Sequence, residues 1–406
     1  MAVSIPPVAV RSVPIADPGD LLERLGPDAP LAWVRGGDGV VGWGETARLE
    51  VDGPDAVAQA RRWWHDQLGQ MVVEDRVGVR GSGPICFGSV AFDQRRSASV
   101  FVVPRAVIGR RDGVTWLTTM GPPSDLPPRS RPQGPGSIAY ADGAISQAQW
   151  CAAVASAVRS IRAGELRKVV LARDLLAHTT PAVDPRFLLQ HLAARYPECW
   201  TFAVDGLIGA TPELLVSRTG REVTSLVLAG TVRWGSSHED EQLIASMVAS
   251  AKDQEEHVYS VRSVADALAP FCRRLDTPEH PEVLRLATVA HLATTVGGRL
   301  SADTDVLSLV DALHPPAAVC GTPTDVALDL IPELEGMDRG RYAGPVGWVD
   351  ATGDGEWGIA LRCAQVDGVS LRLFAGCGIV EGSVPEAELA ETQAKLVTMR
   401  DALAGL

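Results

Sequence analysis

Apolar and polar residues alternate over short stretches in the first part of the chain, a pattern typical of strands joined by turns. Residues 31–35 and 40–44 are mostly apolar and flank Gly-Gly-Asp-Gly at residues 36–39, which predicts a β-hairpin. Residues 88–92 and 99–103 have the same apolar character. We therefore expect the chain to begin with a region rich in strands and turns.

A loop dense in Pro, Gly and Ser at residues 121–135 divides the chain. It separates an N-terminal portion, residues 1–135, from a C-terminal portion, residues 136–406. We expect the N-terminal portion to be integrated in the same fold as the rest. No role is assigned to residues 1–30.

The C-terminal portion mixes helical and strand patterns. Apolar periodicity predicts helices over residues 146–166, 185–195 and about 239–271. Strands are predicted at residues 169–172, 200–204, 206–217, 222–229, 287–294, 342–350, 357–366 and 369–375. Because helices and strands do not alternate strictly, the pattern favours an α+β fold with extensive antiparallel sheet over a Rossmann fold or a barrel.

A last helix is predicted after the Gly-rich turn near the C-terminus. Ser383 is expected to be its N-cap, in a capping box closed by Glu386. Glu388, Glu391 and Lys395 then follow at i, i+3 and i+7, so they share one helical face. Such a face can hold a divalent metal beside an anionic group, although acids near a helix N-terminus are also favoured by the helix dipole alone.

A second acid pair, Asp253 and Glu256, has the same i, i+3 spacing on an earlier predicted helix. If the two helices face each other, four carboxylates meet, and oxygen-only ligands suit Mg²⁺. A solvated helix face is the competing interpretation of each pair taken alone.

Two ionisable residues lie within or beside apolar runs. Lys168 begins Lys-Val-Val-Leu-Ala, where loss of water would disfavour its charged form and suit it to act as a general base. Glu213 follows Thr-Pro and precedes Leu-Leu-Val, where burial would suit it to act as a general acid. The alternatives are a strand-edge lysine with its head in water and a surface glutamate.

Further polar residues stand in apolar strands, and each has an ordinary alternative. Arg362 could bind a carboxylate or be solvated, and His291 could be a satisfied core residue. Gly230 and Thr231 could present donors to a carboxylate or form an ordinary turn, and Tyr342 opens a Gly-rich strand that a ligand could approach.

Composition narrows the classes of function. The net charge of −13 argues against a nucleic-acid surface but allows a small anionic substrate. The seven scattered cysteines form no CxxC pair, so neither a zinc site nor a disulfide framework is indicated. The N-terminus lacks the pattern of a signal peptide, and no segment approaches the ~18–20 apolar residues of a membrane span. We therefore expect a cytoplasmic protein.

Nine ordered motifs between residues 146 and 403 resemble those of the chorismate-utilising enzymes, a family that includes isochorismate, salicylate, anthranilate and aminodeoxychorismate synthases. The motifs are KVVLAR, GATPELLVSR, LAGTVR, SAKDQEEH, HLAT, HPPAAVCGTP, RYAGPVGWVD, GEWGIALRCA and AGCGIVEGSVPEAELAETQAK. The resemblance implies one large chorismate-binding domain, a sandwich of two antiparallel sheets with helices packed outside.

The resemblance also implies a metal site. Glu256 and Glu391 would bind Mg²⁺ directly, and Asp253 and Glu388 would reach it through water. Glu would be equally expected at position 253, so the shorter acid is a departure that would change its water contact but not its charge. The metal would hold the ring carboxylate of chorismate.

The substrate contacts follow from the same resemblance. The ring carboxylate would be surrounded by Gly230, Thr231, Gly376, Gly378 and Lys395. Tyr342 and Arg362 would hold the enolpyruvyl carboxylate, and His291 would lie near the C4 hydroxyl.

Lys168 separates branches of the family, because members that add ammonia resemble one another in carrying a neutral residue there, whereas members that add water carry lysine. The resemblance is therefore greatest to isochorismate synthase, with Lys168 activating water for attack at C2 and Glu213 protonating the departing C4 hydroxyl. No amidotransferase segment is present in the chain, and we expect a monomer that needs no such subunit.

Two alternatives stay open. A salicylate synthase would go on to eliminate pyruvate, and Tyr342 beside Leu361 resembles such enzymes as much as it resembles the pure synthases. A relative that binds chorismate-like ligands without turnover is the third reading. The sequence does not separate menaquinone from siderophore biosynthesis as the pathway served.

Overall fold

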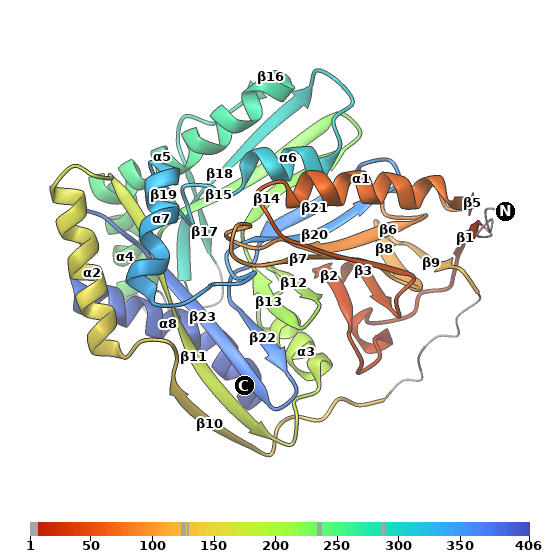
Figure 1. The fold of residues 1–406 in the computed structure, drawn as a ribbon, viewed down its shortest axis with the longest axis horizontal. Helices are drawn as coiled ribbons and strands as arrows, with labels where there is room; N and C mark the ends of the chain where they lie inside the picture. The colour runs from red at the N-terminus through yellow and green to blue at the C-terminus, as the bar shows by residue number, and fades with distance from the viewer. Residues whose placement is uncertain (1–6, 123–126, 128–129, 234–237, 286–288) are drawn as a thin grey trace.

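The computed structural model describes residues 7–122, 127, 130–233, 238–285 and 289–406. Within these ranges the side chains of residues 231, 233, 238–240, 252, 253 and 256 are not described. The described chain forms two large β-sheets with helices packed around them (Figure 1).

Eight α-helices are present in the described ranges. They are α1 (Ala56–Gly69), α2 (Gln147–Arg162), α3 (Pro185–Arg195), α4 (His238–Ala249), α5 (Ala251–Leu268), α6 (Val306–Leu313), α7 (Thr324–Glu335) and α8 (Pro385–Ala404). Helix α2 packs against α7 and α8 at one end of the molecule, and α1 packs against α6 at another (Figure 1).

The first sheet is antiparallel except where β1 and β5 pair in parallel. Its order is β10 (Ser137–Asp142), β11 (Lys168–Thr180), β23 (Ser370–Ile379), β22 (Cys363–Asp367), β13 (Leu207–Thr211), β12 (Trp200–Val204), β2 (Leu31–Arg35), β3 (Asp38–Trp43), β8 (Ala106–Arg111), β9 (Val114–Met120), β1 (Val8–Pro14) and β5 (Met71–Asp75), with β19 (Gly321–Thr322) beside β11.

The second sheet is antiparallel throughout its described pairs. Its order is β16 (Cys272–Asp276), β18 (Val289–Leu300), β15 (Glu222–Arg233), β14 (Leu214–Thr219), β21 (Gly355–Ile359), β20 (Pro345–Asp350), β6 (Ile85–Ser89), β7 (Ser99–Val103) and β4 (Ala47–Val51), with β17 (Glu282–Arg285) beside β18.

The main hydrophobic core lies between the two sheets. Trp33 of β2 in the first sheet and Phe87, Trp348 and Trp357 of the second sheet belong to one buried cluster. A second cluster joins the outer face of the first sheet to α3 and α8. Residues of β2 alternate between the two clusters, as expected of a strand buried on both faces. The predicted α+β sandwich with outer helices is therefore confirmed.

The strands of the N-terminal portion extend both sheets. β2 pairs with β12 and β6 pairs with β20, so hydrogen bonds join the parts of the chain before and after residue 135. The predicted hairpin is confirmed as β2 and β3, and its turn residues Gly36 and Gly37 both have positive φ, as a tight hairpin turn requires. The division of the chain at residue 135 stays a prediction.

Several predicted elements were wrong in their limits, and the strand expected over 206–217 is two strands, β13 and β14, in different sheets. The single helix expected over residues 239–271 is two helices, α4 and α5, which break at Ser250. There the Gln254 side chain donates a hydrogen bond to Val248 O and satisfies one carbonyl at the end of α4. The strand expected over 342–350 begins only at Pro345, and the strand expected over 357–366 is interrupted before Cys363.

The expected capping box of the last helix was also wrong. Helix α8 begins at Pro385 with Val384 as its N-cap, and no side chain caps it. The Ser383 hydroxyl instead accepts a hydrogen bond from Val380 N, which tightens the turn that precedes the helix. Proline at the first helical position fixes the start of the helix instead.

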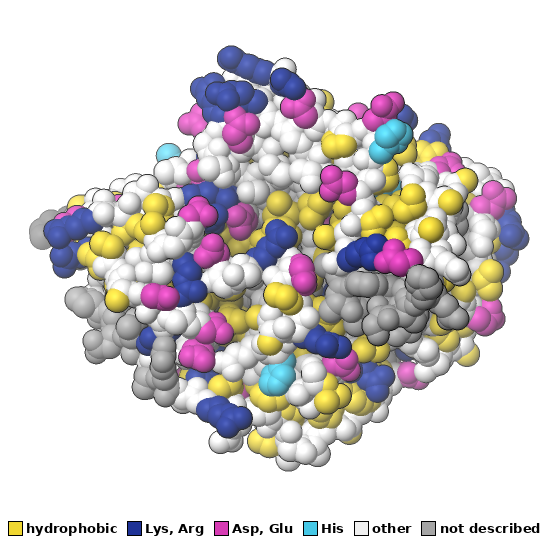
Figure 2. Space-filling view, turned by 180° about the vertical axis from the view of Figure 1, so that it is seen from behind, with side chains coloured by type: hydrophobic (Ala, Val, Ile, Leu, Met, Phe, Trp, Pro, Cys, Tyr) yellow, Lys and Arg dark blue, Asp and Glu magenta, His cyan; other side chains and the backbone are white. Residues whose placement is uncertain are grey.

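Three further features of the described residues concern the surface charges, the helices and the cysteines. Acidic and basic side chains are interspersed over the face opposite to that of Figure 1 (Figure 2). Within the described residues, no helix is long and apolar enough to cross a membrane. All seven cysteines are free.

Candidate active site

A cavity of about 250 Å³ is lined by residues of both sheets and of helix α8. Its wall combines residues near β11 and β23 of the first sheet with residues of β15 and β18 of the second. Ten predicted site residues line it: Glu213, Gly230, His291, Tyr342, Arg362, Gly376, Gly378, Glu388, Glu391 and Lys395. Segments as far apart in sequence as Val170 and Lys395, 225 positions, thus meet around one space.

Lys168 and Glu213 are both buried beside this space, with 3% and 8% of their surfaces exposed. Burial raises the pKa of Glu213 to about 7, and the positive charges of Lys168 and Lys395 oppose that rise. Lys168 is not itself a lining residue, but it lies two positions before Val170, which lines the wall, on the same face of β11. The carboxyl group of Glu213, half protonated near neutral pH, can therefore donate a proton beside Lys168.

His291 is held as a neutral imidazole. Burial lowers its pKa to about 3, and the positive charge of Arg362 adds to the effect. Its Nδ1 lies 3.1 Å from Gly230 O, and in the neutral ring that nitrogen can donate to the carbonyl. Gly230 presents this carbonyl because β15 bulges there, between Ala229 and Thr231, with φ of 72°.

Arg362 is placed by a strained backbone. It lies between β21 and β22 with φ of 49°, a left-handed conformation that is uncommon for a residue with a side chain. Burial lowers the pKa of its guanidinium group. Among the described residues, no hydrogen bond or ion pair to this group is found, so the wall of the cavity contains a cation that is suited to an anionic ligand.

Tyr342 forms the neighbouring part of the wall. Its ring stacks on Phe374 with centroids 4.8 Å apart and 8° between the planes. A Cβ atom at Gly376 would lie 3.2 Å from the Tyr342 hydroxyl and 2.9 Å from Leu171 O. A side chain at position 376 would therefore be crowded, because the Tyr342 phenol and the backbone of β11 both approach this position closely.

Helix α8 contributes the predicted stripe of charges. Glu388, Glu391 and Lys395 all line the cavity, as their spacing indicated. Lys395 Nζ lies 2.6 Å from Glu391 Oε1 and 2.9 Å from Gly376 O. Glu388 is buried, whereas 37% of the Glu391 side chain is exposed.

The other acid pair lies outside the described side chains. Asp253 and Glu256 belong to α5, which packs against β15 and β18, and the position of Thr231 is known only by its place in β15. Among the described residues, no group of three or more potential ligands is close enough to hold a metal. The described part of the donor set, two carboxylates on one helix face, has the chemistry of a site for a hard divalent cation.

The wall also contains residues that the sequence did not single out. Arg339 and Val319 line the cavity, and Arg339 pairs with the buried Glu335. The i, i+4 spacing of Glu335 and Arg339 at the end of an apolar helix was the available signal.

Comparisons with known proteins agree with this geometry. A family model described as chorismate binding enzyme matches residues 127–404. The chain is similar to isochorismate synthase DhbC of Bacillus subtilis, with 39% identity over 335 residues that cover 79% of this chain and 81% of that protein.

Two further similarities extend the comparison. The salicylate biosynthesis isochorismate synthase of Pseudomonas aeruginosa is 41% identical over 286 residues, which cover 69% of this chain and 60% of that protein. The solved structure of MenF, the menaquinone-specific isochorismate synthase of Escherichia coli, superposes with a TM-score of 0.82 at 26% identity, covering 98% of this chain and 95% of that one.

Proposed function

Because the chain belongs to the family of chorismate-binding enzymes, we propose that it is an isochorismate synthase, an isomerase that converts chorismate into isochorismate. The observation that carries this proposal is the pairing of a buried lysine with a buried carboxyl group beside one cavity. The pKa of Glu213, about 7, gives that carboxyl group a proton to donate near neutral pH.

The chemistry assigned to these residues is one concerted exchange. Lys168, in its neutral form, accepts a proton from water as the water oxygen bonds to C2 of the ring. The double bonds shift, the C4–O bond breaks, and Glu213 donates its proton to the departing hydroxyl, which leaves as water. One water is consumed and one is released, so the product is an isomer of the substrate.

The substrate is held by its two carboxylates. Arg362 and Tyr342 bind the enolpyruvyl carboxylate, and the unpaired guanidinium group among the described residues supports this assignment. Lys395 binds the ring carboxylate, beside Gly376 and Gly378 and the backbone of Gly230 and Thr231. Neutral His291 lies near the C4 hydroxyl, where it can accept or donate one hydrogen bond.

A divalent cation completes the site in this proposal. Glu391 and Glu256 would hold Mg²⁺ directly, and Glu388 and Asp253 through water. The bound cation would offset the negative charge of the ring carboxylate and orient the ring. Support comes from the two α8 carboxylates that line the cavity and from the packing of α5 against β15, which carries Gly230.

The cellular setting is proposed on simpler grounds. We place the enzyme in the cytoplasm, because its seven cysteines are all free. A water-adding enzyme needs no amidotransferase subunit, and we expect a monomer of 43.0 kDa. Both menaquinone and siderophore biosynthesis consume isochorismate, and the neighbouring genes would indicate which pathway this enzyme serves.

The test is incubation of the purified protein with chorismate and Mg²⁺, followed by chromatography of the products. Isochorismate as the product is the expected result. Salicylate with pyruvate would identify a salicylate synthase instead. An absence of turnover, at a Mg²⁺ concentration that saturates related enzymes, would contradict both assignments and indicate a binding protein.

A further inference from the structure

Arg339 is a second buried cation in the cavity wall, and the proposed reaction assigns it no part. Arg339 is 3% exposed and its ion-pair partner Glu335 is 1% exposed. Arg339 Nε lies 3.0 Å from Glu335 Oε2, and Arg339 Nη2 lies 2.5 Å from Glu335 Oε1. The guanidinium group also lies 4.1 Å above the ring of Phe92.

The pair binds the backbone of two different segments of the wall. Arg339 Nη1 donates to Val319 O at 2.9 Å, and Arg339 Nη2 donates to Val170 O at 2.7 Å. Glu335 Oε1 accepts from Ala172 N at 2.6 Å. Strand β11 and the segment that contains Val319 are therefore held together from one side by two charged groups.

The turn that contains Tyr342, another part of the cavity wall, is also hydrogen-bonded to Arg339. Tyr342 N donates to Arg339 O at 3.1 Å, which closes the turn between Arg339 and Tyr342. Three parts of the cavity wall, at Val170, Val319 and Tyr342, are thus bonded to one side chain or to its own backbone, in addition to the direct bond from Val170 N to Cys320 O.

Stability alone is a weak reason for such an arrangement. A buried ion pair seldom stabilises a fold more than apolar residues of similar size, because both ions must lose their water. Here Nη1, which has no bond to the carboxylate, and Nη2, which has one, are both directed at carbonyl groups of the wall. Lys168 lies on β11 only two residues before Val170, so a shift of Val170 would also move Lys168 relative to Glu213.

We propose that the Arg339–Glu335 pair positions Lys168 for proton transfer by fixing β11 against the segment around Val319. This inference rests on the proposed function in so far as Lys168 is the base. Arg339 is a positioning residue, because it acts through β11 and not through the reacting atoms.

The proposal predicts which kinetic constant changes. Arg362 and Lys395 bind the carboxylates and are not held by the pair, and Tyr342 is bonded only to the backbone of Arg339, which a substitution of the side chain keeps. KM should therefore change by less than about threefold. Proton transfer by Lys168 occurs only in the transition state, and a misplacement of about 1 Å can cost about 100-fold in rate. We therefore expect kcat to fall about 10- to 100-fold when the pair can no longer hold the two carbonyls.

The variant Arg339→Lys keeps the charge but loses the planar fork that reaches both carbonyl groups. Its matched control is Arg218→Lys. Arg218 is as buried as Arg339, with 4% of its side chain exposed against 2%, and it also donates to a carboxylate, Asp354, and to a backbone carbonyl, Thr352 O. Arg218 does not line the active-site cavity.

A second variant covers the case in which Arg339→Lys does not fold. The double substitution Glu335→Leu and Arg339→Met replaces the pair by apolar side chains of similar size, which is often neutral for stability. It too removes the bonds to Val170 O, Val319 O and Ala172 N. Hydrogen exchange of the peptide that contains residues 168–172 provides a readout that does not depend on turnover.

The expected result is a lower kcat with a nearly unchanged KM and faster exchange at residues 168–172, in whichever of these variants folds, and no change in kcat for Arg218→Lys. Wild-type kcat together with wild-type exchange, in either Arg339→Lys or the double variant, would overturn the inference. If the wild-type protein did not form isochorismate, the proposed function would fail, and unchanged exchange at residues 168–172 would separately overturn the positioning role.

Discussion

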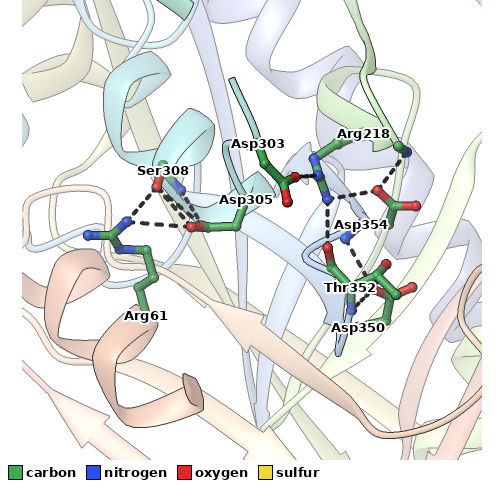
Figure 3. A network of polar contacts seen from close by, with 9 residues as sticks. Arg61, Arg218, Asp303, Asp305, Ser308, Asp350, Thr352 and Asp354 are labelled. Carbon is green, nitrogen blue, oxygen red and sulfur yellow. Dashed lines mark hydrogen bonds and ion pairs between the residues drawn. The ribbon is translucent and has the colours of Figure 1, made fainter. Parts of the chain in front are cut away.

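Two buried charged regions of this molecule differ in how their charges are partnered. In the first, the network around Arg218, the terminal nitrogens of that arginine donate to Asp303, Asp354 and Thr352 O (Figure 3). Asp350 accepts hydrogen bonds from Thr352 N, Thr352 Oγ1 and Asp354 N in the adjoining turn.

The second region is the active-site cavity, which contains ionisable side chains without hydrogen-bond or ion-pair partners among the described residues. Among the described residues, no hydrogen bond or ion pair to the Arg362 guanidinium group is found, and none is found to the Glu213 carboxyl group. The backbone of Arg362 is strained, and the pKa of Glu213 is raised by burial. The strained backbone and the guanidinium group without a described partner are costs to the folded protein that the Arg218 network does not show. A carboxyl pKa raised by burial is common to both regions, since burial also raises the pKa of Asp350.

The difference shows what each region is for. A network in which the terminal nitrogens of the arginine bind carboxylates of the protein stabilises the turn between β20 and β21. A cavity that leaves a guanidinium group and a carboxyl group without protein partners is organised around groups of a ligand. The three predictions that follow test this contrast.

The largest effect is expected from removal of the proton-transfer groups. Lys168→Ala and Glu213→Gln should each lower kcat by about 100- to 10,000-fold, because positioned acids and bases contribute on that scale. Steady-state assays of isochorismate formation measure the loss. Wild-type rates in either variant would show that the assigned base or acid is wrong.

Removal of the central cation of the other region should act on stability. Arg218→Met leaves Asp354 buried without its charged partner, which should lower the free energy of unfolding by about 3–5 kcal/mol. Urea unfolding measures this change, and kcat should stay at the wild-type value where the variant is folded. As a control, Asp303→Asn alters an exposed partner and should change stability by less than about 1 kcal/mol. A loss of kcat in folded Arg218→Met would mean that the two regions are coupled.

The Glu213 carboxyl group should make stability depend on pH in the direction opposite to that of most acids. Its folded-state pKa of about 7 lies above the ordinary value of 4.5, so between these values the folded protein binds more protons than the unfolded chain. Its contribution is therefore intact below pH 4.5 and is lost as pH rises towards 7 and beyond, by roughly 3 kcal/mol.

Glu213→Gln tests this loss, because glutamine resembles the protonated acid at every pH. The variant should match the wild type in stability at pH 4 and exceed it at pH 8, although it is inactive. Thermal unfolding at the two pH values gives the comparison. Equal stability of the variant and the wild type at both pH values would mean that burial of the Glu213 carboxylate has no energetic cost. That result would contradict the difference between the two regions.

Local signals predicted several elements well. Helix α3 and strand β12 have the limits expected from sequence, because Asp184 caps α3, Pro185 fixes its first turn and an apolar run defines β12. The break at Ser250 could not be predicted in this way, since it depends on the Gln254 side chain that reaches Val248 O. The Ser383 cap failed because the hydroxyl binds Val380 N, which precedes the helix.

The residues of the site could likewise be predicted only in part from local signals. Periodicity alone placed Glu388, Glu391 and Lys395 on one face of α8, which the cavity confirms. The residue pattern offered Glu213 as a candidate general acid and Arg362 as a candidate carboxylate ligand, each beside an ordinary alternative. The family resemblance assigned their roles, because burial and backbone strain arise from segments distant in sequence. For Arg339 the spacing from Glu335 could indicate an ion pair, but its backbone partners in β11 and at Val319 are not visible in a side-chain pattern.

The central claim is that this cavity catalyses attack of water on C2 of chorismate, and isotope labelling tests it most directly. Chorismate and Mg²⁺ are incubated with the enzyme in H₂¹⁸O, and the early product is analysed by mass spectrometry with fragments that separate C2 from C4. Attack of water at C2 predicts isochorismate with one ¹⁸O atom, in the C2 hydroxyl. Isochorismate without label at C2, or no isochorismate at all, would contradict it.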